Sequence, residues 1–402
     1  MKILQISNKA PYPPNDGSSL AVYNIAKGFI DNGAELNLIT INTKKHFKSD
    51  NNVPEQFRKN SNYKSIYKDT GVSIFGLIFN LFSSQSYFVS RFFFKEFESE
   101  LVKCLKNNQF DIIHIEGIFM ATYIPVIKKY SSAKIAIRTH NAEHIIWERH
   151  IKNESNLLKK IYLQLQNNRL KKTEIDFLNK ADAVVTITES DKQIFIECGI
   201  DKNYFVSPTG IDLKRYLIDN SLEIKNTFFH LGSMDWLPNI EGVNWFIEEV
   251  YQRFFQNNNN VIFRLAGRFM PESKFKLTSI NLDIQGAIED NILFYNQNEV
   301  MLVPLRSGSG MRIKIIEGMA MGKVIISTSI GAEGIPVSHM ENIIIADTPN
   351  EFANAITLVC SNESLKQKIK QNARMFIQNN YDNTLLTEQL IKFYHSITNK
   401  KN

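Results

Sequence analysis

Short apolar segments that alternate with longer helical patterns are the feature that most restricts how this chain can fold. The segments are rich in β-branched residues and largely apolar along their length, as expected for strands covered on both faces. In the first half of the chain they are residues 2–6, 35–40, 111–115, 134–138 and 183–187. In the second half they are residues 227–231, 261–265, 282–284, 300–303, 324–327 and 343–346. This alternation predicts an α/β chain with parallel sheets.

Two series of such segments predict two doubly wound domains. A chain of 402 residues is long enough for two, since one domain usually holds about 100–200 residues. The first domain is expected over residues 1–207 and the second over residues 227–382, with residues 208–226 as the linker. The linker begins with Pro208-Thr-Gly-Ile-Asp212, a composition typical of a turn.

Composition and charge limit the class of protein. Hydrophobic residues make up 43% and charged residues 22%, which is ordinary for a globular protein. The net charge of +6 is too small to indicate nucleic-acid binding; it suits an anionic ligand or membrane, and a solvated lysine-rich surface explains it equally well. Three scattered cysteines argue against a disulfide framework or a zinc site and fit a reducing compartment. The first apolar run is too short for a signal peptide, and no stretch of about 20 apolar residues could span a bilayer.

Residues 71–94 are unusually aromatic, although polar residues interrupt them. Two interpretations remain open. The segment could form core helices of the first domain, or it could be an interfacial surface that touches lipid or a lipid-linked acceptor. Because the cysteines fit a reducing compartment and no signal peptide is evident, we expect a cytoplasmic protein. Peripheral contact with the inner face of the plasma membrane stays open, since it depends on which interpretation of residues 71–94 holds.

A glycine-containing loop follows the first predicted strand. Residues 11–19 include Gly17 and Ser18, and a helical pattern begins there with Ser18 as the candidate cap. The N-terminus of a helix presents free N–H groups that can hold phosphate. A turn without any ligand accounts for the same residues equally well.

Polar clusters lie at the ends of two further strands in the first half. His114 and Glu116 end one strand, and His140 follows the next in the sequence Arg138-Thr-His-Asn-Ala-Glu-His144. In open α/β sheets, ligands bind beyond the carboxyl ends of the strands. These residues are therefore candidates for a site, although a lone histidine is often structural.

The strongest motif covers residues 304–322. A strand ends, a Gly-Ser-Gly loop follows, and a helix is expected to begin near Met311 and to stop at Gly322. Arg312 and Lys314 place positive charge at the positive end of that helix, which is unfavourable unless an anion binds there. Glu317 follows at a spacing that suits hydroxyls of the same ligand. The pattern indicates a diphosphate at the helix start and a ribose or sugar diol at the carboxylate, with a solvated basic helix start as the alternative.

These pieces together resemble a retaining glycosyltransferase of family 4. The resemblance covers nearly the whole chain: the loop at Gly17, the turn at residues 208–212, Gly232-Ser-Met-Asp-Trp236, Gly267 and residues 304–322. Its most specific part is residues 308–317 followed by Gly331-Ala-Glu-Gly334, which is similar to a bacterial branch associated with cell-surface and exopolysaccharide synthesis.

The resemblance implies the GT-B fold. In it, two Rossmann-like domains face a cleft, and the last helix, residues 383–402, crosses back to the first domain. The donor, a UDP- or GDP-sugar, is expected mainly on the second domain and a glycan or lipid-linked glycan acceptor on the first. Transfer would proceed with retention and without a metal or other cofactor. The residues implied in donor binding are Gly17, Ser18, Gly232, Arg268, Gly310, Met311, Arg312, Ile313, Lys314 and Glu317.

Four residues are expected to carry the chemistry. Arg312 and Lys314 would stabilise charge on the departing diphosphate. By their location, His140 would contact the donor sugar or the reacting centre, and Glu116 would orient the acceptor hydroxyl.

The chain also departs from the family pattern. Ser309 stands where the family often has a glutamate eight positions before Glu317, and Ser233 and Asn239 stand where many members have Arg and Lys. Neutralising the diphosphate should then depend more on Arg312 and Lys314, with Arg268 as a further candidate. Two alternatives stay open: a nucleotide-sugar epimerase of GT-B fold, and a non-catalytic subunit that binds a nucleotide-sugar.

Overall fold

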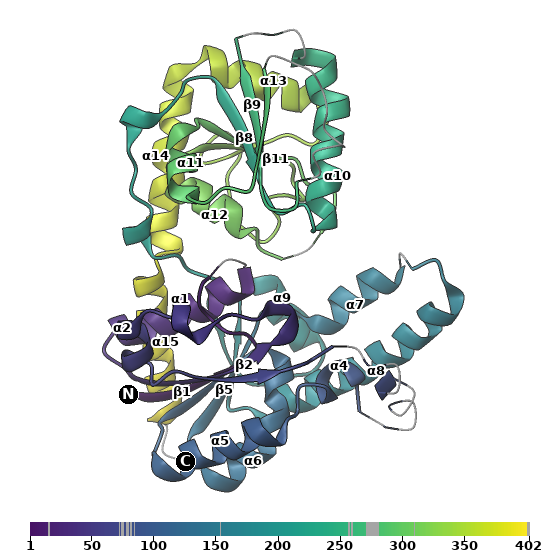
Figure 1. Ribbon diagram of the computed structural model, residues 1–402, viewed down its shortest axis with the longest axis vertical. Helices are drawn as coiled ribbons and strands as arrows, with labels where there is room; N and C mark the ends of the chain where they lie inside the picture. Colours follow the sequence, from purple (N-terminus) through teal and green to yellow (C-terminus); the bar gives the residue numbers. More distant parts are fainter. Residues whose placement is uncertain are drawn as a thin grey trace. The chain divides into compact units, whose positions relative to one another are not determined.

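The computed structural model describes residues 1–14, 17–71, 73, 76–77, 80, 83, 85–152, 154–255, 258, 260–270, 281–308 and 310–399. The three aromatic residues in the first half of the 71–94 segment, Phe75, Phe79 and Phe82, and also Ser309, lie outside this set. The chain forms two compact units: Met1–Gly210 with Asn383–Asn402, and Ile211–Asp382 (Figure 1). We call them unit 1 and unit 2.

Unit 1 is built on a seven-stranded parallel sheet with the strand order β3-β2-β1-β4-β5-β6-β7. The order reverses between β1 and β4, and this is where ligands bind in doubly wound folds. The register places Ser7 beside Glu116, and Glu116 beside Arg138, at the carboxyl ends of neighbouring strands. The strands are β1 (Lys2–Ser7), β2 (Glu35–Thr43), β3 (Lys64–Lys68), β4 (Ile112–Glu116), β5 (Lys134–Thr139), β6 (Ala183–Thr186) and β7 (Asn203–Val206).

Helices cover both faces of this sheet. One face packs on α5 (Lys95–Asn107), α6 (Ile124–Tyr130) and residues of α8 (Leu157–Lys180) and α9 (Glu189–Glu197). The other face packs on α1 (Gly17–Asp31), α2 (Glu55–Asn60) and α15 (Asn383–Thr398). Neighbouring residues of one strand alternate between the two cores, as Ile3 and Leu4 of β1 do.

The last helix is fixed tightly against unit 1. A Cβ at Gly28 of α1 would lie 2.2 Å from Oγ1 of Thr387, so only glycine allows this approach of α1 and α15. Asn24 donates to the carbonyl of Gly210 at 2.7 Å, and Asn383 donates to the carbonyl of Asn24 at 2.7 Å. The expected return of the C-terminal helix to the first domain is therefore observed.

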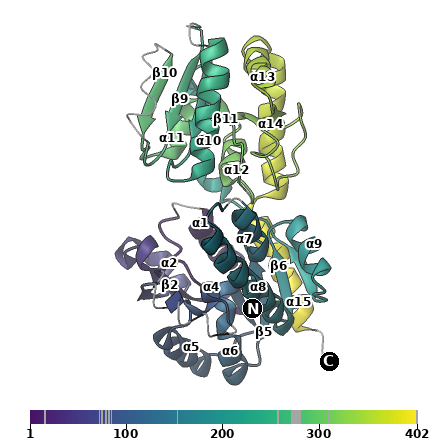
Figure 2. The ribbon, with the colours of Figure 1, turned by 90° about the vertical axis from the view of Figure 1, so that its right-hand side faces the viewer.

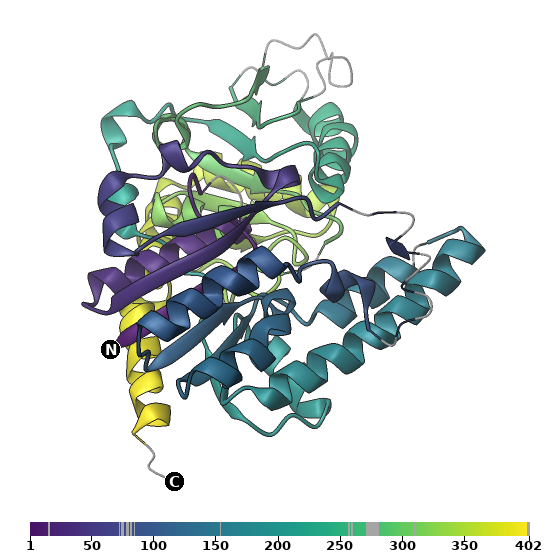
Figure 3. The ribbon, with the colours of Figure 1, turned by 60° about the horizontal axis from the view of Figure 1, so that its bottom comes forward.

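A helical hairpin extends from unit 1. Helix α7 (Glu143–Lys152) and the N-terminal half of α8 lie side by side and reach beyond the sheet (Figures 1 and 3). Short helices, α4 (Tyr87–Ser90) and the 3₁₀ segment Ile118–Tyr123, contact α8 near its middle. No helix in the described part of the chain is long and apolar enough to cross a membrane.

Unit 2 repeats the same plan with six parallel strands in the order β10-β9-β8-β11-β12-β13. They are β8 (Thr227–Leu231), β9 (Ile262–Ala266), β10 (Leu282–Gly286), β11 (Val300–Val303), β12 (Val324–Ser327) and β13 (Ile344–Ile345). One core holds α10 (Leu237–Trp245), its π-helical continuation Phe246–Phe255, and α13 (Pro349–Ser361). The opposite core holds α11 (Asn291–Gln297) and α12 (Ile313–Ala320). Helix α14 (Glu363–Asn380) contributes to both cores and lies beside α13 (Figure 2).

The predicted fold class of two Rossmann-like domains is thus confirmed, and each predicted strand is present to within a few residues. Two edge strands, β3 and β7, were not predicted. Each is only partly buried, so neither shows the continuous apolar pattern of the covered strands. Two helix starts also differ: α1 begins at Gly17 rather than after Ser18, and α12 begins at Ile313 with Arg312 in the capping position.

Candidate active site

The loop before α12 carries the first group of predicted residues. It leaves β11 and turns at Gly308 and Gly310, whose φ angles of 111° and 81° favour glycine. Arg312 is buried, donates to the carbonyl of Gly310, and lies 5.4 Å from the ring centre of Trp236. A Cβ at Gly308 would come within 2.9 Å of the Arg312 guanidinium. The glycines therefore allow the loop to close around a stacked arginine.

Lys314 lies one residue into the helix and is held by neutral groups. Its Nζ donates to Oδ1 of Asn239 at 2.9 Å and faces Gly232, where a Cβ would be only 2.6 Å away. Behind it, His230 is fully buried; burial, with Lys314 nearby, holds the pKa of His230 well below its usual range. Among the described residues, no carboxylate forms an ion pair with Lys314.

Burial and the nearby Arg312 lower the pKa of Lys314 to about 7. The ammonium is therefore only partly protonated near neutral pH in the free protein. A bound anion would favour the charged form and raise this pKa. The site is thus prepared for a negatively charged group and is electrostatically unfavourable without one.

We expect binding of a nucleoside diphosphate to unit 2 to take up close to one proton at pH 8, because Lys314 passes from mostly neutral to charged. Calorimetric titration with UDP at pH 8, in buffers with different protonation enthalpies, measures this number. In Lys314→Met the uptake should disappear. A binding enthalpy in the wild type that does not depend on the buffer would contradict the assignment.

Glu317 lies one helical turn beyond Lys314. Its Oε1 accepts a hydrogen bond of 2.8 Å from the hydroxyl of Tyr216, and burial raises the pKa of this carboxyl. No hydrogen bond to the second carboxyl oxygen is formed by the described residues, so this oxygen can accept from hydroxyls of a ligand. The pKa of Tyr216 is raised by burial and by Glu317, so Tyr216 remains a hydrogen-bond donor.

The remaining predicted residues of unit 2 lie around this group. The carbonyl of Gly232 would be 1.8 Å from a Cβ at Gly267, so glycine is required where the ends of β8 and β9 meet. Arg268 is exposed on the loop after β9, and its carbonyl accepts from the amide of Met234 at 2.8 Å. Met311 and Ile313 are half-buried at the start of α12. Gly17 and Ser18 belong to unit 1, where both are exposed in the first turn of α1.

In unit 1, a buried network surrounds Glu116. The hydroxyl of Tyr394 lies 2.5 Å from Nδ1 of His114, whose Nε2 lies 2.9 Å from Oε1 of Glu116. Arg138 donates to Oε2 at 3.3 Å, and Nε2 of His140 lies 2.6 Å from the same oxygen. Burial alone would raise the pKa of Glu116, but Arg138 and the two histidines hold it well below its usual range. Glu116 is therefore ionised.

This network corrects the role expected for Glu116. Its side chain has no exposed surface, and both of its oxygens are occupied by protein donors, so it has no free approach to an acceptor hydroxyl. His140, in contrast, is 19% exposed. Its Nε2 faces Glu116, so Nδ1 is the ring nitrogen that can meet a ligand. Glu116 is thus a positioning residue that fixes the orientation of the His140 ring.

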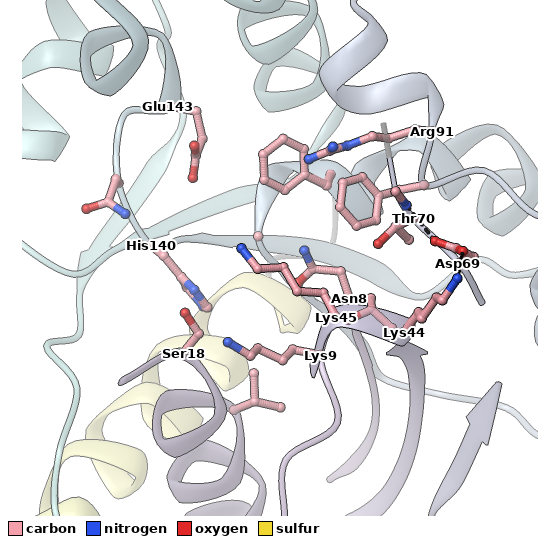
Figure 4. A pocket seen from close by; sticks show the side chains of 17 residues that line it. Asn8, Lys9, Ser18, Lys44, Lys45, Asp69, Thr70, Arg91, His140 and Glu143 are labelled. Carbon is pink, nitrogen blue, oxygen red and sulfur yellow. Dashed lines mark hydrogen bonds and ion pairs between the residues drawn. The ribbon is translucent and has the colours of Figure 1, made fainter. Parts of the chain in front are cut away.

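His140 lines a cavity of about 780 Å³ in unit 1 (Figure 4). Figure 4 shows Ser18, His140 and Glu143 on one side of it and Asp69, Thr70 and Arg91 on the other. Glu143 begins α7, and its amide donates to Oε1 of the buried Glu174 at 3.1 Å. Burial, together with the carboxylates of Glu174 and Asp191, raises the pKa of Glu143 to about 8. At neutral pH it is a protonated, neutral side chain.

We expect Glu143 to make the protein less stable as pH rises. Below its usual pKa of 4.5, the carboxyl is protonated in both the folded and the unfolded protein. Between pH 4.5 and about 8, only the folded protein keeps this proton. The free energy of unfolding therefore falls as pH rises through this range. Glu143→Gln should remove this slope and stabilise unit 1 by about 1–3 kcal/mol at pH 8.5. Urea unfolding at pH 5.5 and 8.5 tests this, with Glu148→Gln, an exposed carboxylate of the same helix, as the matched control. Equal slopes for wild type and Glu143→Gln would be contrary to this expectation.

Solved structures share this architecture over nearly the whole chain. HepE of Anabaena, in complex with UDP, superposes with a TM-score of 0.66 at 14% identity over 98% of this chain and 100% of that chain. Sucrose-phosphate synthase of Thermosynechococcus elongatus superposes with a TM-score of 0.68 at 16% identity over 99% of both chains. The two parallel α/β units, each with polar residues at the carboxyl ends of its strands, have the GT-B fold.

Family models narrow this further. The model "Glycosyltransferase Family 4" matches residues 15–215, and the model "Glycosyl transferases group 1" matches residues 225–362. The chain belongs to glycosyltransferase family 4. It is 23% identical to an uncharacterized 44.6 kDa protein in the cps region of Klebsiella pneumoniae, over 97% of this chain and 99% of that one. It is also 24% identical to the capsular polysaccharide biosynthesis glycosyltransferase CapM of Staphylococcus aureus, over 54% of this chain and 62% of that one.

Several residues of the two sites escaped the sequence interpretation. Tyr216 lies in the segment predicted as linker, and Tyr394 lies 280 positions from its partner His114. The sequence showed Asn239 only as a position where many family members have a lysine. In the structure, its side-chain oxygen accepts the hydrogen bond from Lys314. The residue types at the strand ends indicated where the two sites lie. They did not indicate which remote residues contact the predicted ones.

Proposed function

We propose that this protein transfers a sugar from a UDP- or GDP-sugar to a glycan or lipid-linked glycan, with retention of anomeric configuration, in the synthesis of a cell-surface polysaccharide. The observation that carries the proposal is the start of α12. Lys314 has a pKa of about 7 and no carboxylate partner among the described residues, the buried Arg312 lies two residues before it, and Glu317 follows one turn later. This is an anion site with a carboxylate placed for hydroxyls.

The chemistry follows from these groups. The bond between the sugar C1 and the phosphate oxygen breaks, and a bond from the acceptor oxygen to C1 forms on the same face. The acceptor proton passes to the leaving phosphate oxygen. Arg312, Lys314 and the backbone amides at the start of α12 stabilise the negative charge that develops there. His140, held by Glu116, contacts the sugar or the reacting centre, and no metal or cofactor takes part.

The relatives support the choice of substrates. HepE was solved with UDP, with UDP and glucose, and with UDP-glucose, which favours UDP as the nucleotide to test first. The CapM name and the cps region of the Klebsiella relative favour a surface polysaccharide as the product.

Nuclear magnetic resonance tests the proposal directly. The protein is incubated with UDP- or GDP-sugars and candidate glycan acceptors, with EDTA present. The expected product carries the anomeric configuration of the donor. A new nucleotide-sugar formed from donor alone would instead show an epimerase, and nucleotide-sugar binding without transfer to any acceptor would show a non-catalytic subunit.

We also propose a peripheral membrane contact, located on α8. Leu157, Leu158, Ile161 and Leu165 are 69%, 80%, 60% and 39% exposed and lie on one side of the helix. Two lysines of the same helix, Lys159 and Lys160, adjoin this stripe, and Lys159 also pairs with Glu154. An apolar stripe bordered by cations fits an anionic lipid surface.

The double variant Leu158→Gln/Ile161→Gln should bind vesicles containing phosphatidylglycerol about tenfold more weakly than wild type, because two large apolar side chains leave the interface. Flotation measures the bound fraction, with phosphatidylcholine vesicles as the lipid control. The variant Phe254→Gln/Met375→Gln, which changes exposed apolar residues of unit 2, should bind like wild type. Equal binding of all three proteins would refute the contact, and a change in oligomeric state of the first variant would show that a second copy covers the stripe.

A further inference from the structure

Positively charged side chains predominate among the charged residues that line the cavity of unit 1. Lys9, Lys44, Lys45 and Arg91 all line the cavity (Figure 4). Asp69 lines it too, but Nζ of Lys44 lies 2.9 Å from its carboxylate, and this pairing holds the pKa of Asp69 below its usual range. Glu143, as shown above, is neutral near pH 7. Among the described lining residues, Asp69 is therefore the one ionised carboxylate, and its pairing with Lys44 leaves Lys9, Lys45 and Arg91 as an excess of positive charge.

Arg91 is a half-buried cation of this group. Its guanidinium lies 5.1 Å from the ring centre of Phe92, and its Nε is buried without a hydrogen-bond partner in the described part of the protein. No carboxylate among the described residues forms an ion pair with it. Burial lowers the pKa of Arg91, which means that the charged form is held at a cost. A guanidinium kept half-buried and unpaired is suited to a planar or tetrahedral anion that it can bind through two N–H groups.

The rest of the lining suits a sugar. Phe92 and Phe119 are stacked at 5.1 Å between ring centres, and together they offer an apolar surface to the cavity. Asn8, Thr43, Thr70 and Asn141 supply neutral donors and acceptors. A volume of about 780 Å³ accommodates a ligand of the size of a sugar with an attached phosphate or diphosphate.

We infer that this cavity is an acceptor subsite for a phosphorylated sugar, in which Arg91 and Lys45 bind the phosphate or diphosphate and the sugar lies toward His140. The inference rests on the proposed function, because it takes His140 as the end of the cavity where transfer occurs. Arg91 and Lys45 would bind the phosphate of the acceptor, whose charge does not change during the reaction. Arg312 and Lys314, in contrast, would stabilise the charge that develops on the departing nucleoside diphosphate. A free sugar phosphate and a lipid-linked one share this chemistry.

Calorimetry with inorganic pyrophosphate tests the subsite. The protein is first saturated with UDP so that unit 2 is occupied, and pyrophosphate is then titrated in. Wild type should bind it, Arg91→Gln about tenfold or more weakly, and the exposed Lys45→Gln about threefold more weakly. Arg253→Gln, which removes an exposed arginine of unit 2 outside the cavity, should match wild type. Methyl α-D-glucopyranoside, which has no charge, should not displace the pyrophosphate.

Failure of the subsite and failure of the proposed function give different results. If UDP does not bind, the donor assignment fails. Pyrophosphate is then titrated into Arg312→Gln, in which the competing anion site of unit 2 is removed, so that the cavity is still tested. Arg91→Gln and Lys45→Gln both binding pyrophosphate like wild type would overturn the inference, as would no binding by the UDP-saturated wild type. Displacement by glucose 1-phosphate but not by farnesyl phosphate supports a free sugar phosphate as acceptor, and the reverse supports a lipid-linked one.

Discussion

Arg312→Gln should lower the rate of sugar transfer by about 100-fold or more while the protein remains folded. Arg312 is buried over Trp236 beside the start of α12, where the charge of a departing diphosphate would develop. A charged hydrogen bond in such a place contributes about 1.5–3 kcal/mol to binding, and more in a transition state that carries additional charge. Glutamine keeps part of the stacking and a polar end, so the loss reports mainly on the charge.

Steady-state kinetics with varied donor measures the effect, and thermal unfolding verifies the fold. Arg253→Gln is the matched control, since Arg253 is exposed on the π-helical segment of the same unit and pairs only with Glu249 among the described residues. It should transfer sugar like wild type. Near-normal kcat/KM in folded Arg312→Gln would remove this residue from the phosphate site, and the charge would then have to be met by Lys314 and the helix amides alone.

The sequence was sufficient for the fold because the covered strands of a doubly wound sheet carry a strong local pattern. Continuous apolar runs such as β11 and β12 have no other reasonable location than between two layers of helices. Edge strands β3 and β7 lack that pattern, since one side of each is unpaired and partly exposed. The anion site before α12 could also be predicted from the sequence, because its glycines and cations are close together in the chain.

The partners of these residues could not be predicted, since they come from remote segments. The pKa of Lys314 depends on burial against Gly232 and on Arg312, and that of Glu143 depends on Glu174 and Asp191. Arg91 appeared in the sequence only as an interruption of an aromatic segment, whereas the fold places it across a cavity from His140. Residue types at strand ends indicate that a site exists. What each group can do depends on its burial and on its charged neighbours, and these are known only from the three-dimensional structure.

Glu116→Gln is expected to destabilise unit 1 by about 3–5 kcal/mol at pH 7, because it leaves Arg138 fully buried without its carboxylate. The depressed pKa of Glu116 gives stability that is present above its usual value and lost as pH falls through the folded value. The variant should therefore show a smaller loss of stability on acidification than wild type. Urea unfolding at pH 7 and at pH 3 measures both effects.

Two further variants separate stability from catalysis. Glu116→Gln/Arg138→Met removes both charges and should recover part of the lost stability, since no unpaired ion remains in the core. It should not recover transfer, because His140 has then lost the carboxylate that orients its ring. His140→Ala should unfold near the wild-type midpoint, since its side chain is partly exposed at the cavity, yet transfer slowly. If the double variant regained both stability and activity, Glu116 would be a purely structural partner of Arg138, and the orientation of His140 would have to come from the ligand itself.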